Sequence, residues 1–192
     1  MAITISGDSP NLTSASLTTP TLTSPTFAGT PSGSIITSGT AVASTSGTSI
    51  DFTSIPSWVK RVTVMLNGVS TNATGHLLIQ LADSGTVRTS GYDSVAGVMA
   101  SGGNTVVSST AGFIMYNSTT DYTQISTLTL TLQTGTTWMG TIAGKTTYSG
   151  PTNSITGGGG SIALSAALDR VRITSVSGTA VFDAGSINIL YE

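Results

Sequence analysis

The sequence predicts an all-β protein in which an extended N-terminal arm precedes an antiparallel β-sandwich of the jelly-roll kind. Three observations favour this architecture. Charged residues are only 7% of the chain, against about 25% in ordinary globular proteins, and Ser, Thr and Gly take their place. The mean hydropathy is nevertheless positive, so the chain has enough apolar surface for a core. Beyond the arm, apolar and polar residues alternate with a period of two, as in strands with one buried face.

The arm, residues 1–39, contains a repeat of five residues. A large apolar side chain recurs at Leu12, Leu17, Leu22 and Phe27. A period of five matches neither a helix nor a strand, and the prolines within the repeat exclude a regular helix. A single copy cannot bury these side chains against itself. We therefore expect the arm to serve attachment and trimerisation, by winding with parallel copies or by lying in a groove of another protein.

Residues 40–192 are expected to form the sandwich, with about eight to ten strands. The alternation is clearest at five places: Val62–Leu66, Leu77–Leu81, Leu128–Leu132, Val171–Ile173 and Ile187–Tyr191. Turn signals separate these segments: Asn67–Gly68, Asp83–Gly85, Ser101–Asn104, Gly157–Gly160 and Asp183–Gly185. Helical spacing is limited to the short stretch Ala163–Leu168.

The glycine run at 157–160 is interpreted as a hairpin loop. A phosphate-binding loop would require a following Lys-Ser/Thr and a helix, and neither pattern is present.

Three segments resemble parts of virion proteins of tailed bacteriophages. Residues 45–70 read TSGTSIDFTSIPSWVKRVTVMLNGVS, residues 21–27 read TLTSPTF, and residues 186–192 read SINILYE. The first and last resemble a β-sandwich module found at the distal ends of tail fibres and tailspikes and in capsid cement proteins. The second is similar to the arms that precede such modules. The resemblance implies a homotrimer and does not extend to residues 85–160.

The residues that commonly carry catalysis are sparse. His76 is the sole histidine, and the sequence beside it lacks the orienting groups of a catalytic triad. We interpret it as an edge-strand residue. Polysaccharide-cleaving tailspikes need paired carboxylates, whereas most aspartates here occupy turn contexts, where their side chains form Asx turns. The chain is therefore not expected to be an enzyme, and we predict no catalytic, cofactor or metal site.

Aromatic residues in the unassigned half are candidates for contact with glycans. Trp138, Tyr116 and Tyr122 lie near Thr, Asn and Asp residues, and such groups stack on sugars and form hydrogen bonds with them. Burial in a core is the competing explanation, because aromatic side chains often bury large areas. Trp58, just before a predicted strand, is interpreted as a packing anchor at the strand entry.

Composition also limits the partners. The chain has no Cys, a net charge of −2 and six scattered Lys and Arg residues, which disfavours a nucleic-acid partner. Neither a signal peptide nor an apolar run long enough to cross a membrane is visible.

The leading prediction is a trimeric capsid cement protein on the outer surface of a virion, bound to the major capsid protein. Contact of the same protein with the host surface is compatible with this role. The alternative is a short tail or head fibre that recognises host glycans. A glycan hydrolase is the least favoured class.

Overall fold

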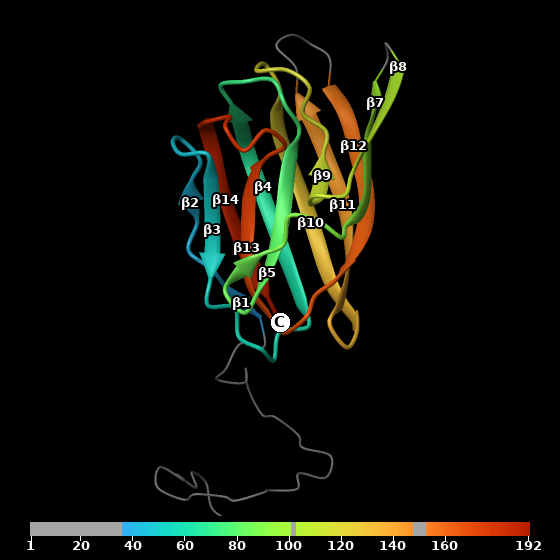
Figure 1. Cartoon of the computed structure of the whole chain (residues 1–192). Helices are drawn as coiled ribbons and strands as arrows, with labels where there is room; N and C mark the ends of the chain where they lie inside the picture. Colours follow the sequence, from blue (N-terminus) through green and yellow to red (C-terminus); the bar gives the residue numbers. More distant parts are fainter. Residues whose placement is uncertain (1–35, 101–102, 148–152) are drawn as a thin grey trace, which may run out of the picture. The chain divides into compact units, whose positions relative to one another are not determined.

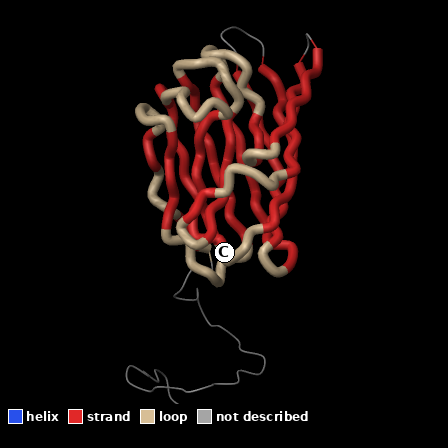
Figure 2. The backbone as a smooth tube through the Cα atoms, in the orientation of Figure 1, coloured by secondary structure: helices blue, strands red, loops and turns tan. Residues whose placement is uncertain are grey.

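The computed structural model describes residues 36–100, 103–147 and 153–192 (Figure 1). By compactness the chain divides into Met1–Ser34 and Ile35–Glu192, and all described residues belong to the second unit. They form two antiparallel sheets without a helix (Figure 2). The predicted all-β sandwich is therefore confirmed.

The large sheet contains nine strands of the described chain. Along the sheet they follow the order β1 (Thr37–Ser38), β14 (Phe182–Tyr191), β4 (Arg61–Thr71), β10 (Thr123–Thr134), β11 (Thr137–Thr147), β12 (Asn153–Ala163), β7 (Asp93–Ala100) and β8 (Gly103–Ser109). The short strand β2 (Val42–Ala43) also pairs with β14. Because β1 pairs with β14, residues 37–38, which the sequence assigned to the arm, belong to the sandwich.

The small sheet contains five strands of the described chain. Its order is β3 (Ser49–Thr53), β13 (Leu168–Ser175), β5 (Leu77–Asp83) and β6 (Thr86–Val87), and β9 (Phe113–Met115) pairs with β5. Strands that are distant in the sequence are therefore neighbours in both sheets.

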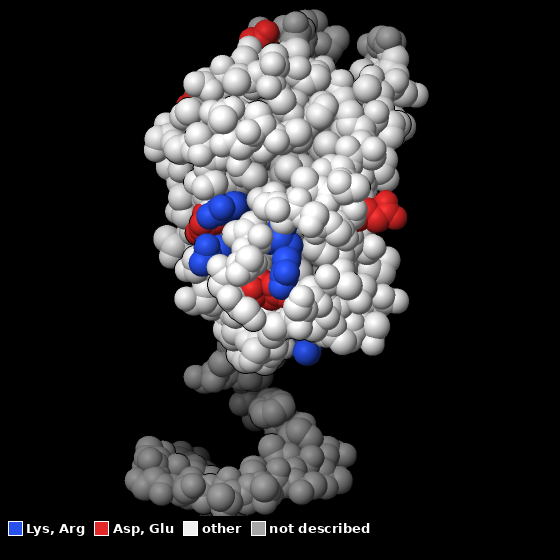
Figure 3. Space-filling view, in the orientation of Figure 1, with Lys and Arg blue, Asp and Glu red and all other residues white. Residues whose placement is uncertain are grey.

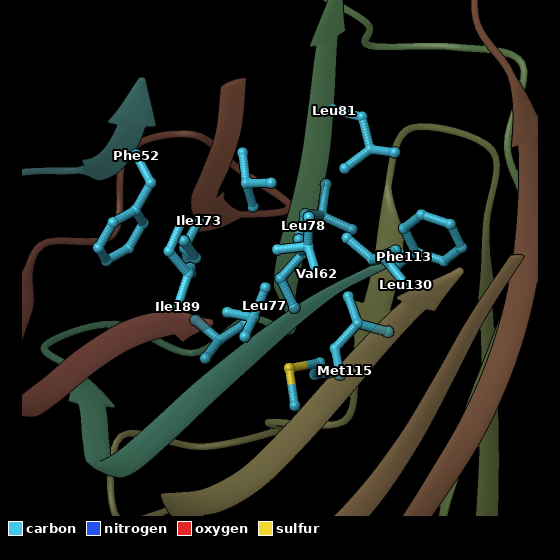
Figure 4. Close-up of a cluster of buried hydrophobic side chains, with 14 of the residues drawn as sticks. Phe52, Val62, Leu77, Leu78, Leu81, Phe113, Met115, Leu130, Ile173 and Ile189 are labelled. Carbon is cyan, nitrogen blue, oxygen red and sulfur yellow. The ribbon is translucent and has the colours of Figure 1, made fainter. Parts of the chain in front are cut away.

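The core lies between the two sheets. In β4, β10 and β14 the alternating apolar residues point inward, and Val64, Leu128 and Ile189 are aligned across the three strands with exposures of 3% or less. Side chains from the small sheet, among them Leu77 and Ile173, meet this layer (Figure 4). Complete burial of each such side chain contributes roughly 1.5–3 kcal/mol, so this layer supplies the main stabilisation of the sandwich.

Strand β5 differs from its prediction, because both of its faces are buried rather than one. The inner face carries Leu77, Ile79 and Leu81. On the outer face, Gln80 donates a hydrogen bond from Nε2 to the carbonyl of Ala111 at 2.9 Å. A loop segment thus covers the side that the alternation had assigned to solvent.

Two predicted turns are instead irregularities inside long strands. Asn67 and Gly68 lie within β4, and Gly185 lies within β14. The pairing of β4 with β10 and β14 shifts in register beside these residues. Gly68 and Gly185 both have positive φ angles, of 69° and 91°, and pack so closely that a Cβ on Gly185 would overlap the Gly68 carbonyl. Glycine here permits a β-bulge rather than a hairpin.

The Gly157–Gly160 run was also predicted wrongly as a loop, because it forms the middle of β12. The cause is steric. A Cβ on Gly158 would overlap the Val95 carbonyl oxygen of the neighbouring β7, and a Cβ on Gly160 would overlap the Asp93 carbonyl oxygen. Close approach of two backbones is a recognised reason for glycine within a strand.

The remaining turn and helix predictions have mixed outcomes. A turn joins β5 to β6 at Ser84 and Gly85, as predicted. Of the predicted turn Ser101–Asn104, Gly103 and Asn104 belong to β8, and residues 101–102 lie outside the described part of the chain. The short helix candidate at 163–168 is not helical; most of it is the connection between β12 and β13.

Candidate functional site

Charged side chains gather on the outer face of the small sheet. In Figure 3 the basic and acidic atoms concentrate over the region of β3, β13 and β5, and uncharged residues cover most of the same view. Asp51 accepts two hydrogen bonds from Arg172, both at 2.7 Å, and Arg170 lies 3.8 Å away. The hydrogen bonds from Arg172 outweigh partial burial and lower the pKa of Asp51. Asp51 therefore links β3 to β13, and the cluster of one aspartate and two arginines keeps a net positive charge.

Asp83 has a different environment, because its side chain is fully buried. It forms an ion pair with Arg88 and accepts hydrogen bonds from the backbone N–H groups of Ser165 at 2.5 Å and Ala166 at 2.9 Å. Burial alone would raise the pKa of Asp83, but these donors outweigh it and hold the pKa below its usual value. The carboxylate joins the end of β5 to the connection before β13.

Asp169 and Asp183 also make long-range contacts. In the turn after β5, the N–H of Gly85 donates a hydrogen bond to Asp169 at 2.6 Å. The acceptor for this backbone N–H therefore comes from another part of the chain. Asp183 accepts a hydrogen bond from the Ser70 hydroxyl. The prediction of local Asx turns is thus wrong for Asp83 and Asp183, and these carboxylates connect separate segments of the sandwich.

His76 is half-buried immediately before β5, which has neighbours on both sides, so the predicted edge-strand position is incorrect. Its Nδ1 accepts a hydrogen bond from the Asn117 N–H at 3.0 Å. Burial lowers the pKa of His76, which disfavours its charged form. The imidazole has a structural role in holding the loop after β9.

The three proposed glycan-contact residues do not form one site. Tyr116 and Tyr122 are adjacent, with an edge-to-face arrangement at 6.0 Å, although Tyr116 is only 8% exposed. Trp138 is 2% exposed and pairs with Leu132 near the other end of the β10–β11 hairpin. Thr146 of β11 pairs with Gln124, two residues after Tyr122, and so marks the end of the hairpin near the tyrosines. Trp138 lies eight residues away from Thr146, which corresponds to about 25 Å along the strand. Trp138 belongs to the core and has no free ring face for a sugar.

Trp58 also departs from its prediction. Its side chain is 54% exposed and lies 6.0 Å from the ring of Tyr191. It is therefore a surface aromatic beside the last strand rather than a buried anchor. The arm residues Leu12, Leu17, Leu22 and Phe27 lie outside the described part of the chain.

The outer face of the large sheet carries the most prominent apolar surface. Four side chains of adjacent strands are 46–69% exposed and surround a groove of about 430 Å³. We call Val95, Met99, Val106 and Ile155 the apolar patch. Gly97 pairs with both Gly157 and Val106, so the absence of two side chains creates the hollow between the flanking residues.

The sequence of β7 does not predict this patch. Residues 94–99 read SVAGVM, so apolar residues occur on both faces of β7. An alternation of this kind does not indicate which face is buried. Only the register with β12, in which Ile155 is opposite Met99, identifies the exposed row.

A second groove, of about 360 Å³, crosses the outer face of the small sheet. Its lining is rich in hydroxyl groups and includes Ser49, Thr89 and Ser177, together with Gln80 and Arg172. These groups are suitable hydrogen-bond partners for a polar, uncharged ligand.

Within residues 36–100, 103–147 and 153–192, His, Asp and Glu form no group of three that could hold a metal ion. The same residues include no helix that could cross a membrane. Comparisons of the chain with models of protein families, with curated proteins and with solved structures give no match.

Proposed function

We propose that this chain is a structural protein of a tailed-phage virion, a homotrimeric cement protein that reinforces the outer surface of the capsid. The observation that carries the proposal is the exposed apolar patch on the outer face of the large sheet, whose middle rows are uncharged. Contiguous apolar surface of this kind is typical of an interaction site. The resemblance of residues 45–70 and 186–192 to virion modules supports the same assignment.

The use of the charged groups also favours assembly. Asp51 and Asp83 neutralise nearby arginines within the sandwich. Asp169 and Asp183 bind groups from other segments of the same chain. These four carboxylates therefore have structural roles, and we assign the protein no catalysis. A surface with so little net charge is suited to close packing against other subunits.

The arm supplies the proposed attachment. Its apolar residues recur every five positions without charged neighbours between residues 9 and 50. They would bind the major capsid protein across its subunit joints. A protein that binds only the assembled shell adds its binding free energy to the stability of that shell.

The test uses capsids stripped of this protein. Purified full-length protein is expected to rebind and to restore heat resistance, whereas the double variant Leu17→Ser and Leu22→Ser should rebind at least tenfold more weakly. Replacement of Thr18 and Thr23 by Ser leaves the apolar repeat intact and serves as the control. Immunogold labelling only at the tail tip, with capsid heat resistance unchanged by removal of the protein, would contradict the proposal.

The second candidate function is a short fibre that recognises host glycans. The hydroxyl-rich groove on the small sheet favours it, because Gln80, Arg172 and the neighbouring hydroxyls offer directional partners for sugars. Labelling at the tail tip and a low copy number per virion are the outcomes that would support this candidate instead.

A further inference from the structure

The apolar patch occupies a defined place in the large sheet. We call residues that pair across neighbouring strands a row. Met99 and Ile155 lie in one row, and Val106 lies in the next row with Gly97 and Gly157. Val95 lies in a third row. The neighbouring strand β8 pairs with β7 alone among the described strands. Apolar side chains beside an edge strand promote association unless they are covered.

Charges on this face are confined to its two ends. Lys145 lies in the row of Ile155, whereas Asp93 and Arg61 lie in the row at the other end. The rows between them contain Thr, Gly, Ala, Val and other uncharged residues. The middle of the face therefore presents no charge to a partner.

We infer that the apolar patch on β7, β8 and β12 is the contact between copies of the chain in the homotrimer, an inference that rests on the trimeric state proposed above. Identical patches can meet here without repulsion between like charges, because β8 and β12 carry no charge and β7 carries only Asp93 at its far end. Lys145 shares the row of Ile155 but lies on β11, outside the patch. In a three-fold arrangement with strands parallel to the axis, each row of one copy lies level with the same row of the others. Met99 and Ile155 from three copies then form one apolar layer, and Val106 forms the next.

The small residues of the face are consistent with this packing. Gly157 and Gly159 on β12 lie level with Ala143 and Thr141 on β11. Short side chains allow sheets to approach closely, and the groove over the glycines can receive a larger side chain of the neighbouring copy. A glycan is a poorer occupant, because the lining of the groove is mainly apolar and its polar residues are limited to Asn104 and Thr105.

Selective oxidation measures whether the face is covered. Met99 lies in the patch, whereas Met139 lies outside it on β11, in the end row with Asp93 and Arg61. Their side chains are 60% and 51% exposed in the single chain, so they should react with hydrogen peroxide at similar rates if nothing covers either. The full-length protein is treated with peroxide, and each methionine is followed by mass spectrometry. We expect Met99 to oxidise at least fivefold more slowly than Met139. Equal rates would overturn the inference.

Charge insertion then identifies the occupant. Val106→Lys places a cation in the contact, and Val176→Lys changes a residue on the loop after β13 that is 54% exposed. Sedimentation equilibrium of the full-length variants is expected to show at least a tenfold rise in the dissociation constant for Val106→Lys and no change for Val176→Lys. Circular dichroism verifies that both variants are folded. If Met99 is protected but Val106→Lys stays trimeric, another segment covers the patch and the inference fails.

The outcome is separable from that of the proposed function. If Val106→Lys dissociates the trimer but the wild-type protein gives stripped capsids no heat resistance, the interface is supported and the cement role is contradicted. If Val106→Lys leaves the trimer intact and the wild-type protein restores heat resistance, only the interface is contradicted.

Discussion

Replacement of Asp83 by Asn removes a buried charge that links two distant parts of the sandwich. Asp83 has 0% side-chain exposure, and it binds Arg88 and two backbone N–H groups. Breaking a buried ion pair costs about 3–5 kcal/mol, and a hydrogen bond to a charged group is worth about 1.5–3 kcal/mol. Because the Arg88 side chain is 34% exposed, water partly replaces its partner. We therefore expect the free energy of unfolding to fall by about 3 kcal/mol, near the lower limit of the range for a buried ion pair.

Thermal unfolding followed by circular dichroism measures this loss, at one protein concentration because oligomerisation contributes to stability. For a domain of this size, 1 kcal/mol corresponds to about 2–4 °C in Tm, so we expect a decrease of about 6–12 °C at pH 7. Asp121→Asn, at an exposed position, should stay within about 0.5 kcal/mol of the wild type. A loss below about 1 kcal/mol for Asp83→Asn would refute the reasoning.

The same variant has a predicted pH dependence. The pKa of Asp83 is lowered in the folded state, so the folded protein binds this proton less readily than the unfolded chain, whose pKa is about 3.9. The stabilising contribution is complete above that unfolded value and disappears as the pH falls through the folded pKa. The stability difference between wild type and Asp83→Asn should be constant from about pH 7 to 5 and should narrow below about pH 4. A difference that grows on acidification would contradict this account.

Two further predictions concern the core and the glycine run. Tyr92→Phe removes the hydroxyl oxygen that accepts the buried Leu81 N–H at 2.6 Å, and the unsatisfied donor should cost about 1–3 kcal/mol in urea unfolding; an unchanged midpoint would show that another acceptor replaces it. Gly160→Ala places a Cβ against the backbone of β7 and should cost about 1–3 kcal/mol. An effect of Gly160→Ala below about 0.5 kcal/mol, the size expected of a surface substitution, would refute the steric explanation.

The strands with one buried face were predictable from the sequence. Leu128 and Leu130 alternate with threonines, and the structure buries the leucines and leaves most of the threonines accessible. The alternation is informative there because the two faces of the strand differ strongly in polarity. The alternation in β5 did not predict its burial, since Gln80 is polar yet a distant loop covers its face.

Glycine and aspartate were the main sources of error, for different reasons. Glycine at 68 and at 157–160 allows either a turn or a close approach of two strands, and the neighbouring strand that decides between them is far away in the sequence. Asp83 was assigned to a local turn, although its partners at 165 and 166 enter through the tertiary fold. The apolar patch depends on register in the same way, so its residues could not be selected from the sequence alone.

The position of β14 has a consequence for synthesis of the protein. This strand pairs with β1, β2 and β4, so residues 182–191 bridge the first described strands to the rest of the large sheet. Such pairings span most of the chain, and contacts of high sequence separation form slowly. During synthesis, the edge of β4 that pairs with β14 stays unpaired until residue 191 has emerged from the ribosome. A product that ends before residue 182 would keep that side open permanently, and unpaired strand edges of this kind expose a nascent chain to aggregation.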